Sequence, residues 1–369
     1  MAAVRRIAPE RLAPTRAATQ LLHRPASAGD PAELARSIAG AQAQDVYAGP
    51  LQFRARSRSL TAADVTKART EERSLLRTWV MRMTVHLIAT EDAGWMLPLF
   101  EPRMEKWERR RLEQLGMPAA DVRKSMRVAK RTLEREAPVT RPELRERIAA
   151  AGVELDNQTG LHVIGLAVTS GLACLGPDKS RSACLVLRED WLGKQPPFDR
   201  EAALAELARR YIGAFGPTTD RDFAKWSGLP LGEMRKGLER IAGELSETRV
   251  GGEMALTLKK GRRKAPAKGQ LRMLGAFDTY MLGYANRDFA LPSKHREAYK
   301  AGGGGWLRPI IVRDGVVIGG WSYRRQGEAV EVTLTSPKSL SRADRKAIDA
   351  EVADIERFEG CPVRLVKSP

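Results

Sequence analysis

One segment near the middle of the chain limits the possible folds more than any other, because it predicts two helices joined by a tight turn. The segment is PTTDRDFAKWSGLPLGEMRKGLERI, residues 217–241, and its turn is Gly228-Leu229-Pro230. A further predicted helix, in AALAELARRYIGAFG, ends just before it at Gly216. Helices in this order are typical of a helix-turn-helix unit, which many proteins use to bind DNA.

The residues after this segment predict a basic wing. Two short runs of strand-like residues within 255–274, ALTLKKGRRKAPAKGQLRML, are joined by a loop that contains glycine and proline. The cations of this loop are accompanied by no acid, and they are Lys259, Lys260, Arg262, Arg263, Lys264 and Lys268. Phosphate contact explains such a cluster better than solubility alone, so we expect it to bind DNA.

A first unit of the same kind is predicted near the N-terminus. Apolar residues recur at helical spacing over 33–51, directly after Asp30-Pro31, which predicts one helix with an N-cap and a proline in its first turn. Thr61 is expected to cap a second helix. The run RTWVMRMTVHLIA, residues 77–89, alternates with period two and predicts a single strand.

A second unit follows a highly charged stretch. Residues 101–130 are rich in arginine with sparse apolar positions, which indicates exposed helices. Thr140 and Glu143 form the pattern of a capping box. The segment 160–176 predicts an apolar helix that ends at a glycine, and 182–190 predicts a short strand.

The C-terminal residues are rich in strands. Residues 306–334 predict three strands, with Asp314-Gly315 at one hairpin turn, and residues 341–357 predict a final helix. The predicted fold class is therefore α+β, with three tandem winged-helix units and a C-terminal β-rich segment. The expected domain ranges are 1–135, 136–195, 196–270 and 271–369.

The charge balance favours a polyanionic partner. The chain has 63 Lys and Arg against 45 Asp and Glu, a net charge of +18. Neutralised phosphates release counterions, so nucleic acid is the usual partner of such a protein. The alternative is a GC-rich genome that raises arginine and alanine use throughout.

Cysteine and histidine spacing argues against metals and disulfides. The three cysteines are widely spaced, and His23, His86, His162 and His295 are scattered without the spacing of metal ligands. We expect no metal, no cofactor and a reducing compartment. No apolar run is long enough to span a membrane and no secretory signal is present, so a cytoplasmic, nucleoid-associated location is expected.

Three blocks of the sequence carry a family resemblance. Gln42-Ala43-Gln44 resembles the Gln-hydrophobe-Gln signature of the AlkZ-like winged-helix DNA glycosylases. RTWVMRMTVHLIA is similar to the block that follows the signature there, and GAFDTYMLGYANRD with PIIVRDGVVIGGW is similar to the C-terminal core. The blocks occur in family order over nearly the whole chain. The related YcaQ-like branch tends to have a carboxylate in place of the second glutamine, so Gln44 indicates the AlkZ side, although Asp45 lies next to it.

The resemblance implies a monofunctional glycosylase that excises alkylated purines from double-stranded DNA, in some members from interstrand crosslinks. Alkylation at N7 makes the purine a cationic leaving group, so no general acid is needed. Gln42 and Gln44 would orient a water molecule beside the developing sugar cation. On an ideal helix, side chains at i and i+2 diverge, so the pair can serve one site only at a helix end or bend. The other interpretation of the two glutamines is a solvated polar pair.

Further DNA contacts are predicted in the 77–89 run, at Arg77, Arg82, Thr84 and His86. An exposed strand face without function is an equally good interpretation of Arg82 and His86, and Asp278 and Tyr280 fit a structural role as well as a functional one. The alternative function is a non-catalytic winged-helix DNA-binding or regulatory protein. A nuclease is disfavoured because no carboxylate cluster suited to magnesium is evident. No obligate protein partner is inferred.

Overall fold

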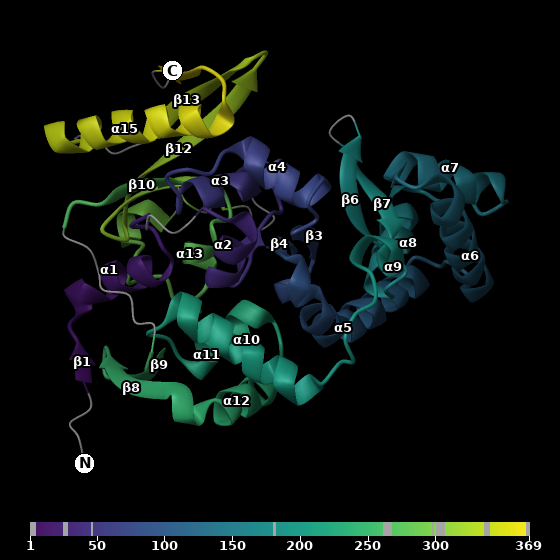
Figure 1. The fold of residues 1–369 in the computed structure, drawn as a ribbon, viewed down its shortest axis with the longest axis horizontal. Coiled ribbons are helices and arrows are strands. Elements are labelled where there is room, and N and C mark those ends of the chain that lie inside the picture. Colours follow the sequence, from purple (N-terminus) through teal and green to yellow (C-terminus); the bar gives the residue numbers. More distant parts are fainter. Residues whose placement is uncertain are drawn as a thin grey trace. The chain divides into compact units, whose positions relative to one another are not determined.

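The computed structural model describes residues 5–24, 29–45, 47–179, 182–260, 268–296, 299, 307–335 and 340–366. The chain divides into two compact units (Figure 1). Unit 1 comprises residues 1–66 and 204–369, and unit 2 comprises residues 67–203. The four domain ranges expected from the sequence follow supersecondary units and not these two compact units. They stay a prediction. No helix among the described residues is long and apolar enough to cross a membrane.

The helix-turn-helix of unit 1 is confirmed. Its helices are α10 (Arg200–Phe215), α11 (Asp220–Ser227) and α12 (Leu231–Arg240). Thr219 caps α11 in a capping box with Asp222, and Gly228 ends the helix in the left-handed region, at φ 77°. A three-stranded sheet with the order β1-β8-β9 follows, built from β1 (Arg5–Ile7), β8 (Leu245–Val250) and β9 (Glu253–Leu258).

The predicted wing differs from the observed one. The two expected strands exist as β9 and β10 (Leu271–Leu274), but they belong to different sheets and do not pair. The hairpin is β8–β9, with its turn at Gly251-Gly252, where both φ angles are positive. The loop after Leu258 therefore links two sheets. Its residues 261–267 lie outside the described residues.

The predicted helix over residues 33–51 is wrong, because three elements replace it. These are α2 (Pro31–Ser37), β2 (Ala41–Gln42) and α3 (Ala48–Arg54). Positive φ angles at Ala39 and Gly40 end the helical path. The predicted start is confirmed, because the Asp30 side chain accepts a hydrogen bond from Ala32 N. Upstream of α2 lies α1 (Pro9–Thr19).

The C-terminal β-rich segment of unit 1 is a sheet with the order β10-β11-β12-β13-β14. Its further strands are β11 (Ile310–Arg313), β12 (Val316–Gln326), β13 (Ala329–Thr335) and β14 (Val363–Val366). The Asp314-Gly315 turn between β11 and β12 is confirmed, and so is the final helix, α15 (Arg342–Glu359), which lies along this sheet (Figure 1). The sequence did not predict β14.

A core cluster of unit 1 joins the N-terminal helices to this sheet. It includes α13 (Thr279–Leu282), which follows β10. Among its buried members are Ala48, Leu274, Tyr280, Ile310 and Val317. Segments far apart in the sequence, α3 and the residues after β10, therefore share one core.

Unit 2 has helices on a mainly antiparallel sheet that includes the order β4-β3-β6-β7-β5. Its strands are β3 (Leu75–Trp79), β4 (Val85–Ala89), β5 (Val139–Thr140), β6 (Ala173–Lys179) and β7 (Ser182–Leu187). Its helices are α4 (Ala62–Thr70), which starts in unit 1, α5 (Ala93–Gln114), α6 (Ala119–Glu136), α7 (Arg141–Ala150), α8 (Asn157–Thr169) and α9 (Arg188–Leu192). The N-cap at Thr61 and the capping box at Thr140 are confirmed. The apolar helix predicted over 160–176 is confirmed only as far as Thr169, because Ala173–Lys179 form β6.

The single strand predicted over residues 77–89 is wrong. Two paired strands, β3 and β4, form a hairpin in which Arg77 lies opposite Leu87 and Trp79 opposite Val85. The turn holds Arg82 and Met83 at positive φ, 54° and 59°. Alternating residues predicted extended backbone correctly, but the turn has no glycine, proline or asparagine to reveal it.

Candidate active site and DNA-contacting residues

Gln42 and Gln44 lie on non-helical backbone between α2 and α3. Gln42 belongs to β2 and is 4% exposed, whereas Gln44 is exposed. The angular divergence of i and i+2 side chains on a helix therefore does not apply to this pair. A solvated pair in an alanine-rich helix is likewise not the observed setting.

The backbone of Gln42 is held by a glutamine outside the motif, Gln52 of α3. Gln52 Nε2 donates to Gln42 O at 2.5 Å, and Gln52 Oε1 accepts from Thr279 N at 3.0 Å. The Gln52 side chain is completely buried. It therefore joins the glutamine motif to the start of α13.

A buried ion pair braces the same segment. Arg56 donates to both carboxylate oxygens of Asp278, at 2.9 Å and 2.8 Å, and also to Gln52 O and Gln20 Oε1, each at 3.0 Å. Asp278 Oδ1 also accepts from Tyr280 N. Arg56 is 0% and Asp278 2% exposed, so each charge depends on the other for compensation. These contacts give Asp278 a structural role.

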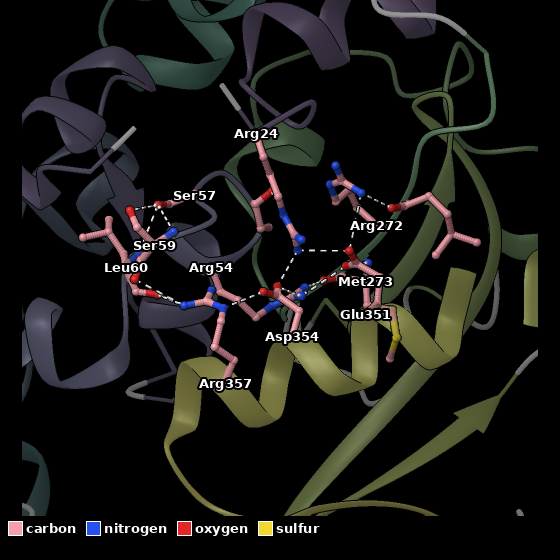
Figure 2. A network of polar contacts seen from close by, with 12 residues as sticks. Arg24, Arg54, Ser57, Ser59, Leu60, Arg272, Met273, Glu351, Asp354 and Arg357 are labelled. Carbon is pink, nitrogen blue, oxygen red and sulfur yellow. Dashed lines mark hydrogen bonds and ion pairs between the residues drawn. The ribbon is translucent and has the colours of Figure 1, made fainter. Parts of the chain in front are cut away.

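A larger arginine cluster ties α3 to α15 (Figure 2). Arg54 Nη1 contacts Glu351 at 3.1 Å and Asp354 at 2.9 Å, while Arg24 contacts the same two carboxylates at 3.0 Å and 2.7 Å. Arg272 also contacts Glu351. Burial lowers the pKa of Arg24 to about 10. The cluster anchors the helix that carries Gln52 from its other side.

Asp45 has a structural role beside the motif. Its Oδ1 accepts from Tyr47 N at 2.8 Å and from Ala48 N at 3.1 Å, at the start of α3. This is how an aspartate caps a first helical turn. One oxygen of the carboxylate next to Gln44 thus accepts from two backbone donors.

The DNA-contacting residues predicted in the 77–89 run belong to unit 2, where Arg77, Arg82 and Thr84 are half-buried. His86 is 1% exposed, and its Nδ1 lies 2.9 Å from Thr84 O. Burial, and secondarily the charge of Arg82, lowers the pKa of His86 to about 3. A neutral, buried imidazole is poorly suited to contact phosphate, and its hydrogen bond holds the hairpin turn instead.

The basic residues predicted to form a wing belong to unit 1. Lys259, Lys260 and Lys268 are exposed, and Lys259 Nζ donates to Gly243 O at 2.7 Å. Arg262, Arg263 and Lys264 lie outside the described residues. Among the residues that the structure describes, no three His, Cys, Asp or Glu side chains are grouped as a metal site would require.

Comparison with known proteins is decisive for the family. The chain matches the family described as DNA glycosylase AlkZ-like over residues 35–358. It belongs to the AlkZ-like family of DNA glycosylases. A curated member, the interstrand DNA cross-link repair glycosylase of Streptomyces sahachiroi, is 30% identical over 319 residues, which cover 79% of this chain and 82% of that protein.

A solved structure supports the same conclusion. The structure of the Streptomyces sahachiroi DNA glycosylase AlkZ aligns with a TM-score of 0.74 at 26% identity, covering 98% of this chain and 100% of that one. As an AlkZ-like protein the chain is a DNA glycosylase, a hydrolase of N-glycosidic bonds that acts on DNA. The α+β fold class and the family resemblance predicted from the sequence are confirmed.

Sequence reasoning missed the residues that hold the motif, Gln20, Gln52 and Arg56. Each is fully buried. A weak signal existed, because Gln52 and Arg56 alternate with the apolar residues Leu51, Phe53 and Ala55. Their partners could not be inferred, since Thr279 and Asp278 are more than two hundred residues away in the sequence.

Proposed function

We propose that this glycosylase excises cationic purines alkylated at N7 or N3 from duplex DNA, with Gln42 and Gln44 orienting the attacking water. The observation that carries the proposal is the fixed backbone of Gln42 beside the exposed Gln44, at the position of the family signature. A catalytic group needs its geometry held by its neighbours, and Gln52 supplies that support.

The chemistry follows from the leaving group. An N7-alkylated purine already carries a positive charge, so its departure needs no protonation. The remaining barrier lies in placing water against the sugar carbon and stabilising the positive charge that develops there. Two amide oxygens can accept hydrogen bonds from that water and direct their dipoles toward the cation. The two backbone donors on Asp45 Oδ1 give this carboxylate a structural role at the start of α3, and we assign it no catalytic one.

The same chemistry determines which substrates we propose. The Streptomyces sahachiroi relative is named for repair of interstrand crosslinks, and we propose crosslinked purines as substrates here because a crosslinked N7 is cationic in the same way. We expect neutral bases such as uracil to stay in place, since their departure needs protonation and the two glutamines supply no acid. The product is an intact abasic site. A location on the cytoplasmic nucleoid follows from the DNA substrate, and we propose no obligate protein partner.

The test is release of 7-methylguanine from methylated duplex DNA, measured by mass spectrometry. Gln44→Ala is expected to fold normally and to lower the rate of release by about 10²- to 10³-fold, the usual contribution of one positioned polar group. Gln326→Ala is the matched control, because Gln326 is an exposed glutamine of β12 in the same unit. Release should persist in excess EDTA. Full activity of a Gln42/Gln44 double variant would remove the mechanism and favour the non-catalytic DNA-binding alternative.

A further inference from the structure

Two arginines of unit 2 lie near Trp79 of β3, and the charge of one influences the other. Arg77 and Trp79 lie two residues apart on β3, so their side chains point to the same face. Arg141 is the first residue of α7, and its Cζ lies 5.8 Å from the centre of the Trp79 ring. Trp79 itself packs partly against the core of unit 2, and the guanidinium of Arg141 lies over its ring.

Neither guanidinium is paired with a carboxylate among the described residues, which distinguishes Arg77 and Arg141 from the ion-paired Arg54 and Arg56. The Nε atoms of Arg77 and Arg141 are buried and have no hydrogen-bond partner within the described part of the chain. The neighbouring carboxylate, Asp178, is paired with Arg69 instead. Glu143 accepts from Lys179 at 2.8 Å and from Thr140, so its charge is also compensated.

This surrounding is unfavourable for two cations. Burial lowers the pKa of both arginines, and for Arg77 the charges of Arg69 and Arg141 add to the effect. A guanidinium does not lose its proton to escape such a site, as a lysine can. An anion bound between the two side chains would supply both the missing acceptors and the missing charge.

We propose that Arg77 and Arg141 together bind one phosphate group, above Trp79. Phosphate suits the pair because its oxygens match the planar N–H donors of a guanidinium. The position of Arg141 in the first turn of a ten-residue helix adds the positive end of the helix dipole. A DNA backbone phosphate is the expected source, which rests on the DNA substrate of the family, whereas a free phosphate would use the same donors.

The first arm of the test measures binding of undamaged duplex DNA to the full chain over a range of salt concentrations. Arg77→Gln and Arg141→Gln are each expected to weaken binding by about tenfold at low salt. Each is also expected to lower the log–log salt slope by about 0.9, the value for one phosphate. Because the two arginines share one phosphate, the double variant should lower the slope no further.

The matched control is Arg147→Gln. Arg147 is an exposed arginine of the same helix, and its guanidinium is already paired with Glu136 at 2.9 Å. The substitution removes the same charge without removing free donors, so the slope should stay near that of the parent. Thermal unfolding of every variant checks that the fold is kept.

The second arm titrates inorganic phosphate against the parent and the double variant and follows the melting temperature. A rise in the parent that is absent in the double variant, with an unchanged DNA slope, assigns the site to free phosphate. Unchanged DNA slopes together with equal responses to phosphate would overturn the proposal. Neither arm measures base release. Failure of the phosphate-site proposal can therefore be told apart from failure of the glutamine mechanism.

Discussion

Buried arginines of the two units have opposite surroundings. In unit 1, Arg54 and Arg56 are 0% exposed, and each is paired with carboxylates that come from distant segments. In unit 2, Arg77 and Arg141 are half-buried, and neither is paired with a carboxylate among the described residues. The Nε atoms of all four arginines are without a hydrogen-bond partner there, so the difference lies in the ion pairs. The first arrangement holds a site together, whereas the second has unused donors for a ligand.

The net charge also differs between the two units. Unit 1 contains 39 Lys and Arg against 25 Asp and Glu, and unit 2 contains 24 against 20. Long-range attraction to DNA therefore comes mainly from unit 1. In the nearly balanced unit 2, binding depends more on where individual cations lie than on their number.

The largest effect is expected from breaking a paired arginine. Asp278→Asn removes the only carboxylate that contacts Arg56 among the described residues and leaves a buried charge. We expect it to lower the free energy of unfolding by about 3–5 kcal/mol. Arg77→Gln breaks no ion pair and removes a cation from unfavourable surroundings, so it should leave that free energy unchanged or raise it. Denaturant unfolding of both variants measures the contrast, and equal costs would break the comparison.

A second prediction concerns acid stability. The pKa of His86 is about 3 in the folded chain, against about 6.5 in an unfolded one. Between these values the unfolded chain binds a proton that the folded chain does not, so stability falls as the pH falls below 6.5. The loss from His86 should reach about 2 kcal/mol at pH 5. His86→Gln should flatten the pH profile of unfolding and leave the salt slope of DNA binding at pH 7 unchanged. A lower slope would restore His86 as a phosphate ligand.

A third prediction separates positioning from stability in unit 1. Gln52 and Gln20 are both fully buried and both contact Arg56, but only Gln52 contacts Gln42. Gln52→Met and Gln20→Met should each lower the free energy of unfolding by about 1–3 kcal/mol, because buried groups are left without their hydrogen-bond partners. Only Gln52→Met should also lower kcat for base release, by about tenfold with KM unchanged. Equal kcat values in the two variants would limit Gln52 to a structural role.

The smallest effect is expected at the basic loop of unit 1. Replacing Lys259 and Lys260 with alanine should weaken binding to all DNA sequences by a few-fold and lower the salt slope by about 0.9 for each phosphate that the variant no longer neutralises. Arg342→Ala with Lys346→Ala removes the same charge from exposed positions of α15. If both double variants lower the slope equally, the loop acts through total charge alone.

Local features of this chain were predictable because a few neighbouring residues decide them. Thr140 and Glu143 close a capping box within one turn, Gly228 ends a helix at positive φ, and Asp314-Gly315 makes a tight hairpin turn. The family resemblance likewise came from short blocks of adjacent residues, Gln42-Ala43-Gln44 among them, in the family's order. Each of these signals involves residues within a few positions of one another in the sequence, where the chain has few alternatives.

Only the tertiary structure decided which distant segments meet. An alanine-rich pattern predicted one helix through Gln42, but left-handed backbone at Ala39 and Gly40 ended it and a strand followed. The strands β9 and β10, adjacent in sequence, joined different sheets. The contacts of Gln52 with Thr279 and of Arg141 with Trp79 have no local signature. Hydrophobic periodicity shows which face of an element is buried, but the partner against that face is chosen by packing over the whole unit.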